Sequence, residues 1–520
     1  MRRDRSWILL LFLISLLLRF LTNSNYGFHR DEFLYISQGQ HPAWGFWSNP
    51  PGPAFFSWIT QLFFGDSLFA IRFLPGLLGG CTVLMVCLIA KEMGGGRFAQ
   101  ILAGCSVIVS NSMPRVFLLY SPVPFDVFYW TLAAYLIVKY LHAEQHKYLL
   151  WLGVVIGAGM LNKYSMIFFV LAAIIALLTT SHRRLFRSRN FYQAVLISLV
   201  IISPNLIWQW QYGFPVIGHM ELLQETQLVN VRITPFLKDQ LLFNSSVLLI
   251  WLPGLFYLFL HPDGKKFVAI GTTFVMIIIL LVLLRGKSYY TLGAYPMLFA
   301  AGAVAWEKWT IPLRWIRAFP ILIALAIFGF TLPFSVPYLP LERMVHYGKR
   351  MVQYGLDGVV RWEDGLVHDL PQDYADMLGW EEMGDLVIKA VRALPDQTQV
   401  FIYCENFGQA GAVAYHGGNA GLPEPASFAD AFVLWAPERI DPSISDFIYV
   451  NDQMGEDVQH LFNKITVIGA VENQYAREQG TTVWLCQEPR TPFNEFWEDR
   501  LQQVTAQLNL PVRSRSQGTD

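Results

Sequence analysis

Long apolar runs separated by short polar loops occupy the first 336 residues of the chain. Runs such as WILLLFLISLLLRFLT and FVMIIILLVLL are long and apolar enough to predict helices that span a membrane. The pattern predicts eleven spans, at residues 7–23, 68–90, 98–113, 124–141, 148–161, 165–180, 191–209, 239–260, 267–284, 289–305 and 318–336. One alternative stays open, because residues 148–180 are also compatible with a single long, tilted helix that would invert every later loop.

The pattern changes after residue 337, where prolines at 333, 337 and 340 interrupt the last apolar run. The remaining segment contains the strand-like runs QVFIYCE, FVLWA, FIYV, ITVIGAV and TTVWLC, with helical patterns at 379–394, 408–415 and 455–464. Strand-like and helical patterns in this order predict a small α/β domain. The predicted fold class is therefore a polytopic α-helical membrane domain, residues 1–336, followed by a C-terminal α/β domain, residues 337–520.

The distribution of basic residues orients the predicted spans. Loops assigned to the cytoplasm carry more than twice as many Lys and Arg residues as the longer outer loops, and SHRRLFRSRN is the most basic of them. Because basic loops stay in the cytoplasm, an odd number of spans places the C-terminal domain outside. The N-terminal segment resembles a signal peptide but lacks a small-residue cleavage site, so we expect it to remain as the first span.

Composition agrees with a membrane protein and narrows the choice of partners. Of the 520 residues, 54% are hydrophobic and 15% are charged, whereas about a quarter are charged in average soluble proteins. A net charge of −1 gives no reason to expect a nucleic-acid partner. The five cysteines lack metal-ligand spacing, and a disulfide between Cys404 and Cys486 in the polar tail is left open.

Ionisable residues at membrane depth are costly and therefore indicate function. Under this topology, six charged residues that are scattered along the sequence reach the outer face of the membrane. They are Asp31, Glu32, Asp126, Lys163, Arg285 and Lys287. A carboxylate can remove a proton from an attacking hydroxyl, and cations can hold a phosphate that leaves with negative charge. We therefore expect one site at this face, with a lipid-linked phosphate as the donor.

The first outer loop, residues 24–67, holds the two adjacent acids and the aromatic stretch WGFWSNPPGPAFF. Aromatic residues favour membrane interfaces, and a segment that lies flat on the membrane has this composition. We expect residues 31–64 to form interfacial helices with a turn at the Pro-Pro corner. Such helices would hold the carboxylates at head-group depth, so this loop is predicted to be catalytic.

Several motifs together resemble those of the membrane glycosyltransferases of the GT-C fold. They are most similar to the bacterial family-39 and RgtA/B/C/D-like branch, which is related to the protein O-mannosyltransferases and the aminoarabinose transferases of lipid A. The motifs are RDEFLY and the Pro-Pro corner, SPVPFDVFYW, GMLNKYSMIFF and GKSYYTLGAYPML, with LPQDYADMLGWEEM and CENFGQAGAV in the tail. The resemblance covers essentially the whole chain.

The resemblance implies an inverting transfer of a sugar from a polyprenyl-phosphate donor to a hydroxyl acceptor at the outer face of the bacterial inner membrane. It implies that Asp31 is the catalytic base, that Glu32 orients the acceptor or a metal ion, and that Asp126 is the second acid. The residues implied to face the donor and its lipid phosphate are Lys163, Arg285, Lys287, Tyr289 and Tyr290. A divalent cofactor held by Asp31 and Asp126 is left open, because Asn49 precedes Pro-Pro where the family has His.

Other interpretations are kept for these residues and for the whole chain. Asp126 is also placed where a helix N-cap would be, and Lys163, Arg285 and Lys287 could extend from span ends to the interface. The alternative function is a transporter or flippase for lipid-linked sugars, although transporters place charges near the midplane and often carry repeats. A third function is a scaffold whose external domain binds polysaccharide. Membrane lipids surround the protein in each case, and the acceptor is a glycolipid, a polysaccharide or a protein.

Overall fold

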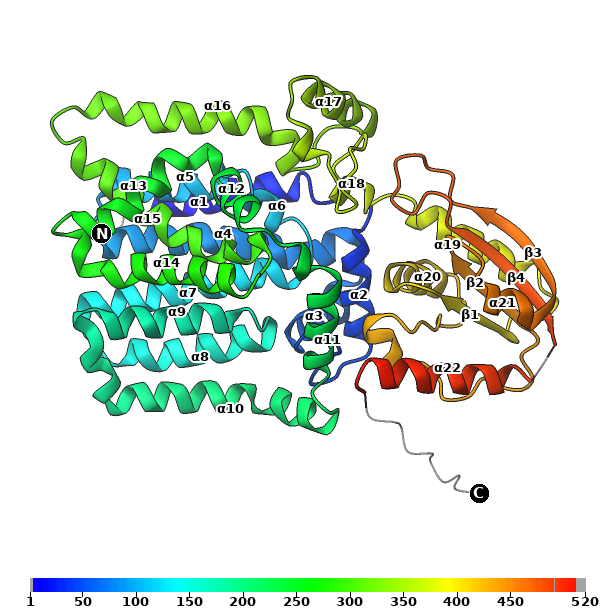
Figure 1. Ribbon diagram of the computed structural model, residues 1–520. Helices are drawn as coiled ribbons and strands as arrows, with labels where there is room; N and C mark the ends of the chain where they lie inside the picture. Colours follow the sequence, from blue (N-terminus) through cyan, green and yellow to red (C-terminus); the bar gives the residue numbers. More distant parts are fainter. Residues whose placement is uncertain (1–2, 491, 511–520) are drawn as a thin grey trace. The chain divides into compact units, whose positions relative to one another are not determined.

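The computed structural model describes residues 3–490 and 492–510 (Figure 1). The contacts within the chain divide it into two compact units. Unit 1 contains Met1–Asn25, Ser67–Asn205 and Leu223–Leu339. Unit 2 contains Tyr26–Asp66, Leu206–Leu222 and Pro340–Asp520. In this division, the first outer loop is grouped with the C-terminal residues, and the last break between the units lies close to the predicted start of the tail domain.

Unit 1 is a bundle of helices, and each predicted span overlaps at least one of them. Its helices are α1 (Arg3–Phe20), α4 (Leu68–Glu92), α5 (Arg97–Ile108), α6 (Met113–Val116), α7 (Pro122–Ala143), α8 (Lys147–Asn162), α9 (Met166–Thr179), α10 (Arg189–Gln211), α12 (Ile233–Leu242), α13 (Leu248–Leu260), α14 (Val268–Leu283), α15 (Tyr295–Trp309) and α16 (Ala318–Ser335). The end of α10, from Leu206, belongs to unit 2. The predicted span 239–260 is divided between α12 and α13, where the helix axis bends by 63°. The helical part of the predicted fold class is thus confirmed.

Four helical segments in the described residues are long and apolar enough to cross a membrane alone. They are Leu68–Glu92, Arg189–Gln211, Gly264–Leu283 and Arg314–Ser335. Two bent pairs, Met166–Thr179 with Ser181–Arg187 and Ile233–Leu242 with Ser245–Leu260, raise the number to six if each pair is one span. The bundle therefore contains membrane-spanning helices, and the total of eleven stays a prediction.

The region 148–180 forms two helices rather than one. α8 ends at Asn162, Lys163 has an extended backbone (φ −155°, ψ 131°), and α9 begins at Met166. α8 packs on α7, α9 packs on α14, and α8 and α9 lie side by side (Figure 1). The single long helix is therefore excluded, and Lys163 lies in the turn between two short helices.

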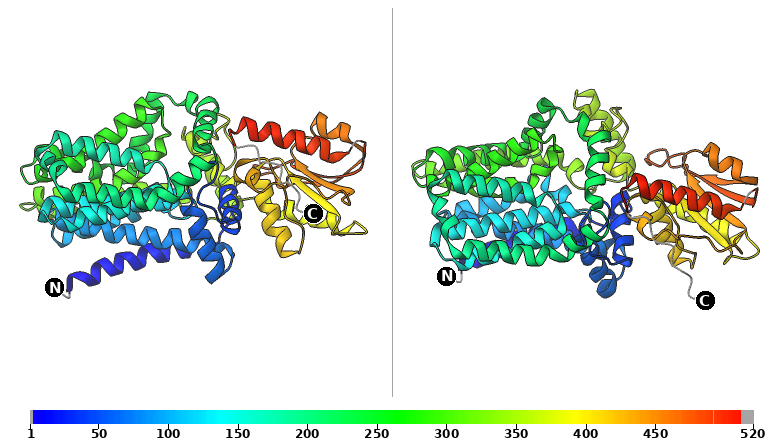
Figure 2. Two further views of the ribbon diagram at one scale, coloured as in Figure 1. Left: turned by 90° about the horizontal axis from the view of Figure 1, so that it is seen from below. Right: turned by 60° about the horizontal axis from the view of Figure 1, so that its bottom comes forward.

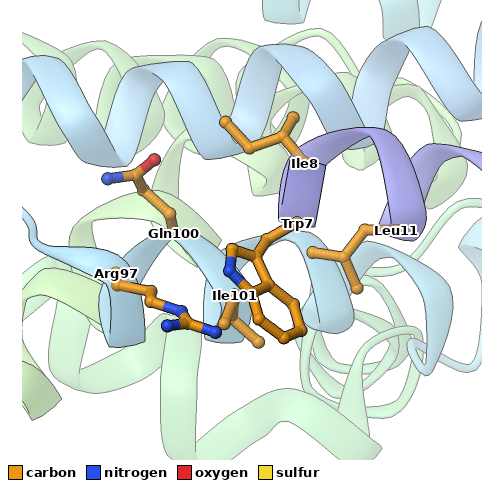
Figure 3. A pocket seen from close by; sticks show the side chains of 6 residues that line it. All are labelled: Trp7, Ile8, Leu11, Arg97, Gln100 and Ile101. Carbon is orange, nitrogen blue, oxygen red and sulfur yellow. The ribbon is translucent and has the colours of Figure 1, made fainter. Parts of the chain in front are cut away.

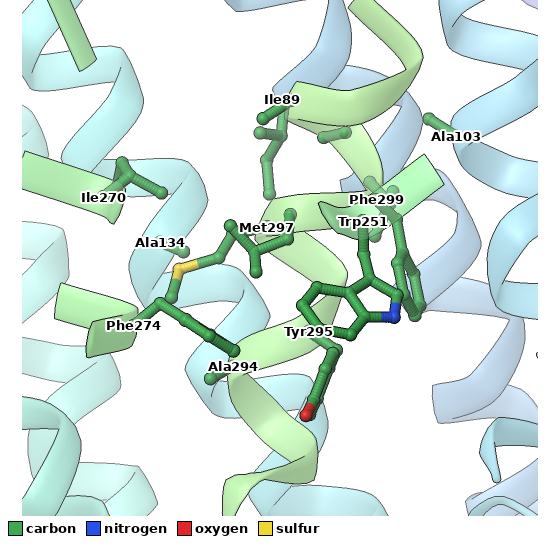
Figure 4. Packing of buried hydrophobic residues seen from close by; sticks show 14 of the residues in the cluster. Ile89, Ala103, Ala134, Trp251, Ile270, Phe274, Ala294, Tyr295, Met297 and Phe299 are labelled. Atoms are coloured by element: carbon green, nitrogen blue, oxygen red, sulfur yellow. The ribbon is translucent and has the colours of Figure 1, made fainter. Parts of the chain in front are cut away.

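The core of unit 1 surrounds α15, which is buried along most of its length. Tyr295 meets Trp251 and Phe274 edge to face, with ring centroids 5.3 Å and 5.4 Å apart (Figure 4). α13 and α15 approach so closely that a Cβ on Gly302 would lie 1.8 Å from the carbonyl oxygen of Ile250. Small residues permit this close approach between membrane helices. The rigid core fixes α15 and the segment that precedes it.

Unit 2 contains a four-stranded sheet with the order β1-β2-β4-β3. The strands are β1 (Val400–Cys404), β2 (Asp446–Asn451), β3 (Phe462–Ala470) and β4 (Thr482–Pro489). β1 and β2 are parallel, whereas β4 is antiparallel to both of its neighbours. Helices α19 (Trp380–Arg392) and α20 (Phe407–Asn419) cover one face, and α22 (Phe493–Gln507) covers the other (Figure 2). This arrangement confirms the α/β domain of the predicted fold class.

Unit 2 contains further helices, two of which belong to the first outer loop. They are α2 (Arg30–Gln40), α3 (Gly52–Phe64), α17 (Leu341–Gln353), α18 (Gln372–Ala375) and α21 (Glu456–Leu461), and α11 (Pro215–Thr226) begins in unit 2. α2 lies against α20 so closely that a Cβ on Gly411 would be 2.6 Å from the Cβ of Phe33. The motifs RDEFLY and CENFGQAGAV are thus in direct contact.

One predicted strand is wrong. The run FVLWA forms the end of a 3₁₀ helix, η8 (Asp430–Leu434), in which Phe432 and Val433 are buried. A short apolar run cannot by itself distinguish a buried strand from a buried helical turn. The predicted helices 379–394 and 408–415 correspond to α19 and α20, whereas α21 ends before residue 464 because β3 follows it directly.

Cys404 and Cys486 are both free and buried. Cys404 ends β1 and Cys486 lies in β4, so β2 runs between them. Neighbouring strands are about 4.8 Å apart, so two strand spacings alone separate these cysteines by at least about 10 Å. A disulfide requires Cα atoms no more than about 7 Å apart. The disulfide that the sequence left open is therefore excluded.

Candidate functional site

The two adjacent acids in the first turn of α2 have different environments. His29 is the N-cap: its Nδ1 accepts a hydrogen bond from the backbone N–H of Asp31 (3.2 Å), while Glu32 Oε2 accepts one from the backbone N–H of His29 (2.8 Å). This reciprocal pair is a capping box, which fixes the residue at which the helix begins. Glu32 is fully buried, whereas the Asp31 side chain is exposed. Asp31 is therefore the acid of this pair that a substrate can reach.

The start of α2 is attached to the tail motif LPQDYADMLGWEEM through Asp376. The backbone N–H of Arg30 donates to the Asp376 carbonyl (3.0 Å), and His29 Nε2 lies 3.8 Å from Asp376 Oδ2. Arg477 Nη1 donates to both carboxylate oxygens of Asp376 (3.2 Å and 3.3 Å). Burial raises the pKa of Asp376, and the charges of His29 and Arg477 oppose this rise. Residues from a distant part of the chain thus hold the helix that carries Asp31.

A second tail carboxylate, Asp430, lies within electrostatic range of Asp31. Ser48 Oγ donates to Asp430 Oδ1 (2.9 Å). Asp430 has a φ of +51°, a left-handed conformation that Asp tolerates better than most residues. Burial raises the pKa of Asp430 to about 6, and the negative charge of Asp31 adds to the rise. Neither Asp376 nor Asp430 was predicted from the sequence, because only the fold brings them near Asp31.

Asn49, which precedes the Pro-Pro corner, has a structural role. Its side-chain amide exchanges two hydrogen bonds with the Gln38 amide (2.9 Å and 3.0 Å) and donates a third to the Pro50 carbonyl (2.9 Å). Both side chains are buried. The amide pair connects the Pro-Pro corner to α2. Asn49 occupies the position at which the GT-C motif described above has a His.

In unit 1, Asp126 lies one turn inside α7, and its side chain is buried. The N-cap of α7 is Ser121, so Asp126 is not the cap. Ser165 Oγ, in the turn between α8 and α9, donates to Asp126 Oδ2 (2.8 Å). The N-cap interpretation of Asp126 is therefore wrong, and its carboxylate instead connects α7 to the turn that carries Lys163.

Lys163 lies at the centre of a cluster formed by α7, the α8–α9 turn and η5 (Ser288–Ala294). Its Nζ is 5.1 Å from the ring centroid of Tyr289 and 4.7 Å from that of Tyr290. The two rings are 4.7 Å apart, edge to face. The Asp126 carboxylate attracts the charge of Lys163, and Lys287 repels it. The structure thus brings five predicted site residues together in unit 1, and we call them the Lys163 cluster: Asp126, Lys163, Lys287, Tyr289 and Tyr290.

Arg285 follows the end of α14 and differs from these residues. Its side chain is exposed, and its backbone has a φ of +51°. It precedes Lys287 by two positions in the segment that enters η5. The structure therefore places Arg285 at the edge of the segment that carries the Lys163 cluster.

Polar residues that the sequence analysis missed hold η5 in place. Ser288 Oγ donates to Asp239 Oδ2 (2.8 Å), and Thr291 Oγ1 donates to Gln240 Oε1 (2.6 Å). The Tyr295 hydroxyl donates to the Gln240 carbonyl (2.9 Å). The sequence offers one signal for these contacts, an acid and an amide at the start of the predicted span 239–260. Together they fix the tyrosine pair that surrounds Lys163.

The divalent metal ion that the sequence analysis left open at Asp31 and Asp126 stays a prediction. Within residues 3–490 and 492–510, no group of three or more His, Cys, Asp or Glu side chains is placed to hold a metal ion. The Asp126 carboxylate accepts a hydrogen bond from Ser165 and faces Lys163. Asp31 belongs to the other unit, where its charged neighbours include Asp376 and Asp430.

A shallow pocket between α1 and α5 lacks the carboxylates of the candidate site. It is lined by Trp7, Ile8, Leu11, Arg97, Gln100 and Ile101 (Figure 3). The Arg97 guanidinium lies 3.9 Å from the centroid of the Trp7 ring. Aromatic and basic residues of this kind are common at the cytoplasmic interface of membrane proteins. The pocket contains no acid, so it is not the candidate site.

Part of the chain is similar in sequence to known glycosyltransferases. Residues 48–208 match the family model described as dolichyl-phosphate-mannose-protein mannosyltransferase. The lipid A galacturonosyltransferase RgtD of Rhizobium johnstonii is 26% identical over 201 residues, which make up 37% of this chain and 41% of RgtD. The match to RgtD thus spans less than half the length of that relative. The family-model match, residues 48–208, includes Asp126 and Lys163.

The fold is similar to that of two solved proteins. ArnT from Cupriavidus metallidurans, solved with bound undecaprenyl phosphate, has a TM-score of 0.64 at 14% identity, with 92% of this chain and 98% of ArnT covered. AglB from Archaeoglobus fulgidus, solved with an inhibitory peptide and a dolichol-phosphate, has a TM-score of 0.50 at 12% identity, with 86% and 69% covered. At such identities the likeness shows the fold. The chain is thus similar over residues 48–208 to a family of membrane mannosyltransferases and has the fold of ArnT.

Proposed function

We propose that this protein moves a sugar from a polyprenyl-phosphate donor to a hydroxyl group of an acceptor. The observation that carries the proposal is the Lys163 cluster, in which a lysine lies beside two tyrosine rings and a buried carboxylate. ArnT was solved with undecaprenyl phosphate and AglB with a dolichol-phosphate, so a lipid phosphate is the ligand class that this fold suggests.

The Lys163 cluster is proposed to hold the donor phosphate. Before the donor binds, the Asp126 carboxylate offsets part of the charge of Lys163, which Lys287 repels. A phosphate brings negative charge that both lysines share, so their repulsion decreases. When the sugar leaves, the phosphate gains charge, and the same cations stabilise it. Tyr289 and Tyr290 keep the ammonium group of Lys163 in place through cation–π contacts.

Asp31 is proposed to act as the general base. Its carboxylate removes the proton from the acceptor hydroxyl, and the hydroxyl oxygen attacks the anomeric carbon from the side opposite the phosphate. The bond between that carbon and the phosphate oxygen breaks, the polyprenyl phosphate leaves as an anion, and the new glycosidic bond has inverted configuration. Solvent then takes the proton from Asp31. We assign Glu32 and His29 to positioning, because their capping box fixes the start of α2.

The proposed reaction takes place at the outer face of the bacterial inner membrane, as the distribution of basic loops predicts. Arg285, at the edge of the segment that enters η5, is proposed to approach the same lipid phosphate from the membrane surface. The name of RgtD refers to lipid A, and AglB was solved with a peptide. The acceptor is therefore proposed to be a hydroxyl of a glycolipid, a polysaccharide or a protein.

A transfer assay in liposomes tests the proposal. Purified full-length protein is supplied with radiolabelled sugars on undecaprenyl phosphate and with envelope extract as acceptor. We expect label to enter an acceptor fraction with release of an equal amount of undecaprenyl phosphate, and we expect added undecaprenyl phosphate to inhibit the reaction. A transporter or flippase would instead carry the intact labelled donor across the bilayer and form no glycosidic bond. That result would overturn the proposal.

A further inference from the structure

A second cavity lies within the C-terminal α/β domain, and its lining includes residues of β1, β2 and α22. It therefore lies on the face of the sheet that α22 covers. It encloses about 200 Å³. Its aromatic walls include Phe401 and Tyr403 from β1, Phe447 and Tyr449 from β2, and Trp497 from α22. The side chains at alternate positions of a strand share one face, which explains why these two strands present their aromatic residues together. The transfer proposed above uses none of these residues.

The aromatic walls are fixed by contacts of their own. Tyr403 pairs with Tyr449 across β1 and β2, and their rings are parallel with centroids 6.1 Å apart. Trp497 Nε1 donates to the Pro437 carbonyl (2.8 Å), and Phe428 stacks on the indole at 4.7 Å. Rings that are already ordered lose little freedom on binding, which favours a rigid and partly apolar ligand.

The rim of the cavity carries a chain of polar contacts. Asn451 Nδ2 donates to the Tyr449 hydroxyl (3.0 Å), and that hydroxyl donates to Glu405 Oε2 (3.2 Å). A carboxylate offers about four acceptor positions, so Glu405 retains capacity for donors from a ligand. Asp457 and Arg500 also line the cavity. Two carboxylates and one guanidinium give this rim a net negative charge.

A single sugar ring matches the size and the chemistry of the cavity. A cavity of about 150 Å³ admits benzene, so this one has room for one six-membered ring. A pyranose presents an apolar C–H face, which suits the aromatic walls, and hydroxyl groups, which suit Glu405 and Asn451. An acyl chain would leave the polar rim unpaired, and an acidic sugar would meet an excess of carboxylates.

We infer that this cavity binds one uncharged or amine-bearing pyranose ring of the glycan acceptor. The identity of the ring as part of the acceptor rests on the proposed function, whereas the binding itself requires no transfer. Holding the acceptor on the C-terminal domain would raise its concentration near the enzyme and would give this domain a role in acceptor choice.

The test is saturation-transfer NMR on the full-length protein in nanodiscs, with methyl glucoside, glucosamine and galacturonate as probes. We expect saturable binding of the first two and at least five-fold weaker binding of galacturonate. Glu405→Gln should weaken glucosamine binding at least five-fold, because it removes the charge that faces the amine. Val458→Phe, which adds bulk at the cavity wall, should abolish the binding of both probes. Glu495→Gln is the matched control, because Glu495 is exposed on α22 and does not line the cavity.

Several outcomes would overturn the inference. These are no saturable binding of any sugar, binding that Val458→Phe leaves unchanged, or displacement of the sugars by octanoate, which would indicate an acyl site. Thermal unfolding of each variant checks that the domain is folded, and Glu405→Gln keeps the test valid if Val458→Phe does not fold. Transfer without sugar binding in the cavity would reject only this inference, whereas sugar binding without transfer would reject the proposed function.

Discussion

The Lys163 cluster in unit 1 and the start of α2 in unit 2 differ in how far their acids are exposed. In the Lys163 cluster, the acid is buried, a hydroxyl group donates to it, and the lysine is enclosed by tyrosine rings. At the start of α2, Asp31 is exposed, while its neighbour Glu32 is buried and used as a cap. The first arrangement compensates charge inside an apolar bundle, and the second leaves one carboxylate accessible.

We interpret this difference as a division of roles, in which the Lys163 cluster binds the donor phosphate and Asp31 takes part in the reaction. A half-buried cation held by aromatic rings beside a carboxylate has a restricted position, which suits a group that must hold a phosphate throughout a reaction. A general base must accept a proton and release it again, so it needs access to the acceptor and to solvent.

The largest effect is expected for the two acids of α2. Asp31→Asn should lower kcat by about 10²- to 10⁴-fold, because it removes a general base, and should leave the midpoint of thermal unfolding unchanged. Glu32→Gln should instead lower that midpoint, because it removes a charged acceptor from a buried N–H group. The two variants are compared by transfer assay and by thermal unfolding. Equal loss of activity and stability in both would abolish the distinction between a reactive and a structural acid.

The next effect concerns the Lys163 cluster. Lys163→Met should weaken the binding of undecaprenyl phosphate by about 10- to 100-fold, since one charge-assisted contact is lost. It should also destabilise the protein by about 1–2 kcal/mol, because Asp126 is left without its cation. Adding Asp126→Asn should restore stability but not binding. If the double variant regained binding, Lys163 would serve only to neutralise Asp126.

A pH-dependent effect is expected for Asp430. Burial raises its pKa from 3.8 to about 6, so the folded protein holds this proton more tightly than the unfolded chain does. Stability therefore falls as the pH rises through this interval. Asp430→Asn should remove that slope and stabilise the protein above pH 6 by about 1–3 kcal/mol, since the amide oxygen can still accept from Ser48. Thermal unfolding between pH 4 and 7 measures the slope, and the exposed Asp499→Asn serves as control. If Asp430→Asn left the dependence of stability on pH unchanged, ionisation of Asp430 would not destabilise the folded protein.

The smallest effect is expected for the tyrosine pair. Tyr290→Leu removes a cation–π contact worth about 0.5–2 kcal/mol and should weaken donor binding by a few-fold. Tyr290→Phe keeps the ring and should bind the donor nearly as well as the natural protein. Titration with undecaprenyl phosphate distinguishes them. If both substitutions weaken binding equally, the tyrosine hydroxyl rather than the ring acts on the donor.

The sequence predicted the elements better than it predicted the contacts between them. Apolar runs gave the helices of unit 1, because the length and hydropathy of a run decide whether it can span a membrane. The division of residues 148–180 near Lys163 was predicted and is confirmed. The alternative of one long helix could not be excluded from the sequence, since the choice depends on how α8 packs on α7 and α9 on α14. FVLWA was mistaken for a strand because burial alone does not determine backbone conformation.

For the candidate site too, the sequence predicted residues better than it predicted their long-range contacts. Lys163, Tyr289 and Tyr290 were predicted as one group, and the structure brings them together in unit 1. Asp376 lies inside the motif LPQDYADMLGWEEM and Asp430 in no motif, and neither was assigned a role. Both were missed because their approach to Asp31 depends on long-range contacts. Ser165 lies inside the quoted motif GMLNKYSMIFF, but its hydrogen bond to Asp126 follows from the turn and not from the motif.

The hydrogen bonds from Ser48 to Asp430 and from Arg30 to Asp376 also constrain how such proteins can be recombined. A chimera that exchanged only the tail after residue 340 would replace the Asp430 carboxylate that accepts from Ser48 and the Asp376 side chain that lies beside His29. Residues 26–66 would have to be exchanged together with the tail for α2 to keep its contacts with the tail. Laboratory exchange of acceptor preference between relatives should therefore succeed only when both segments are moved as a pair.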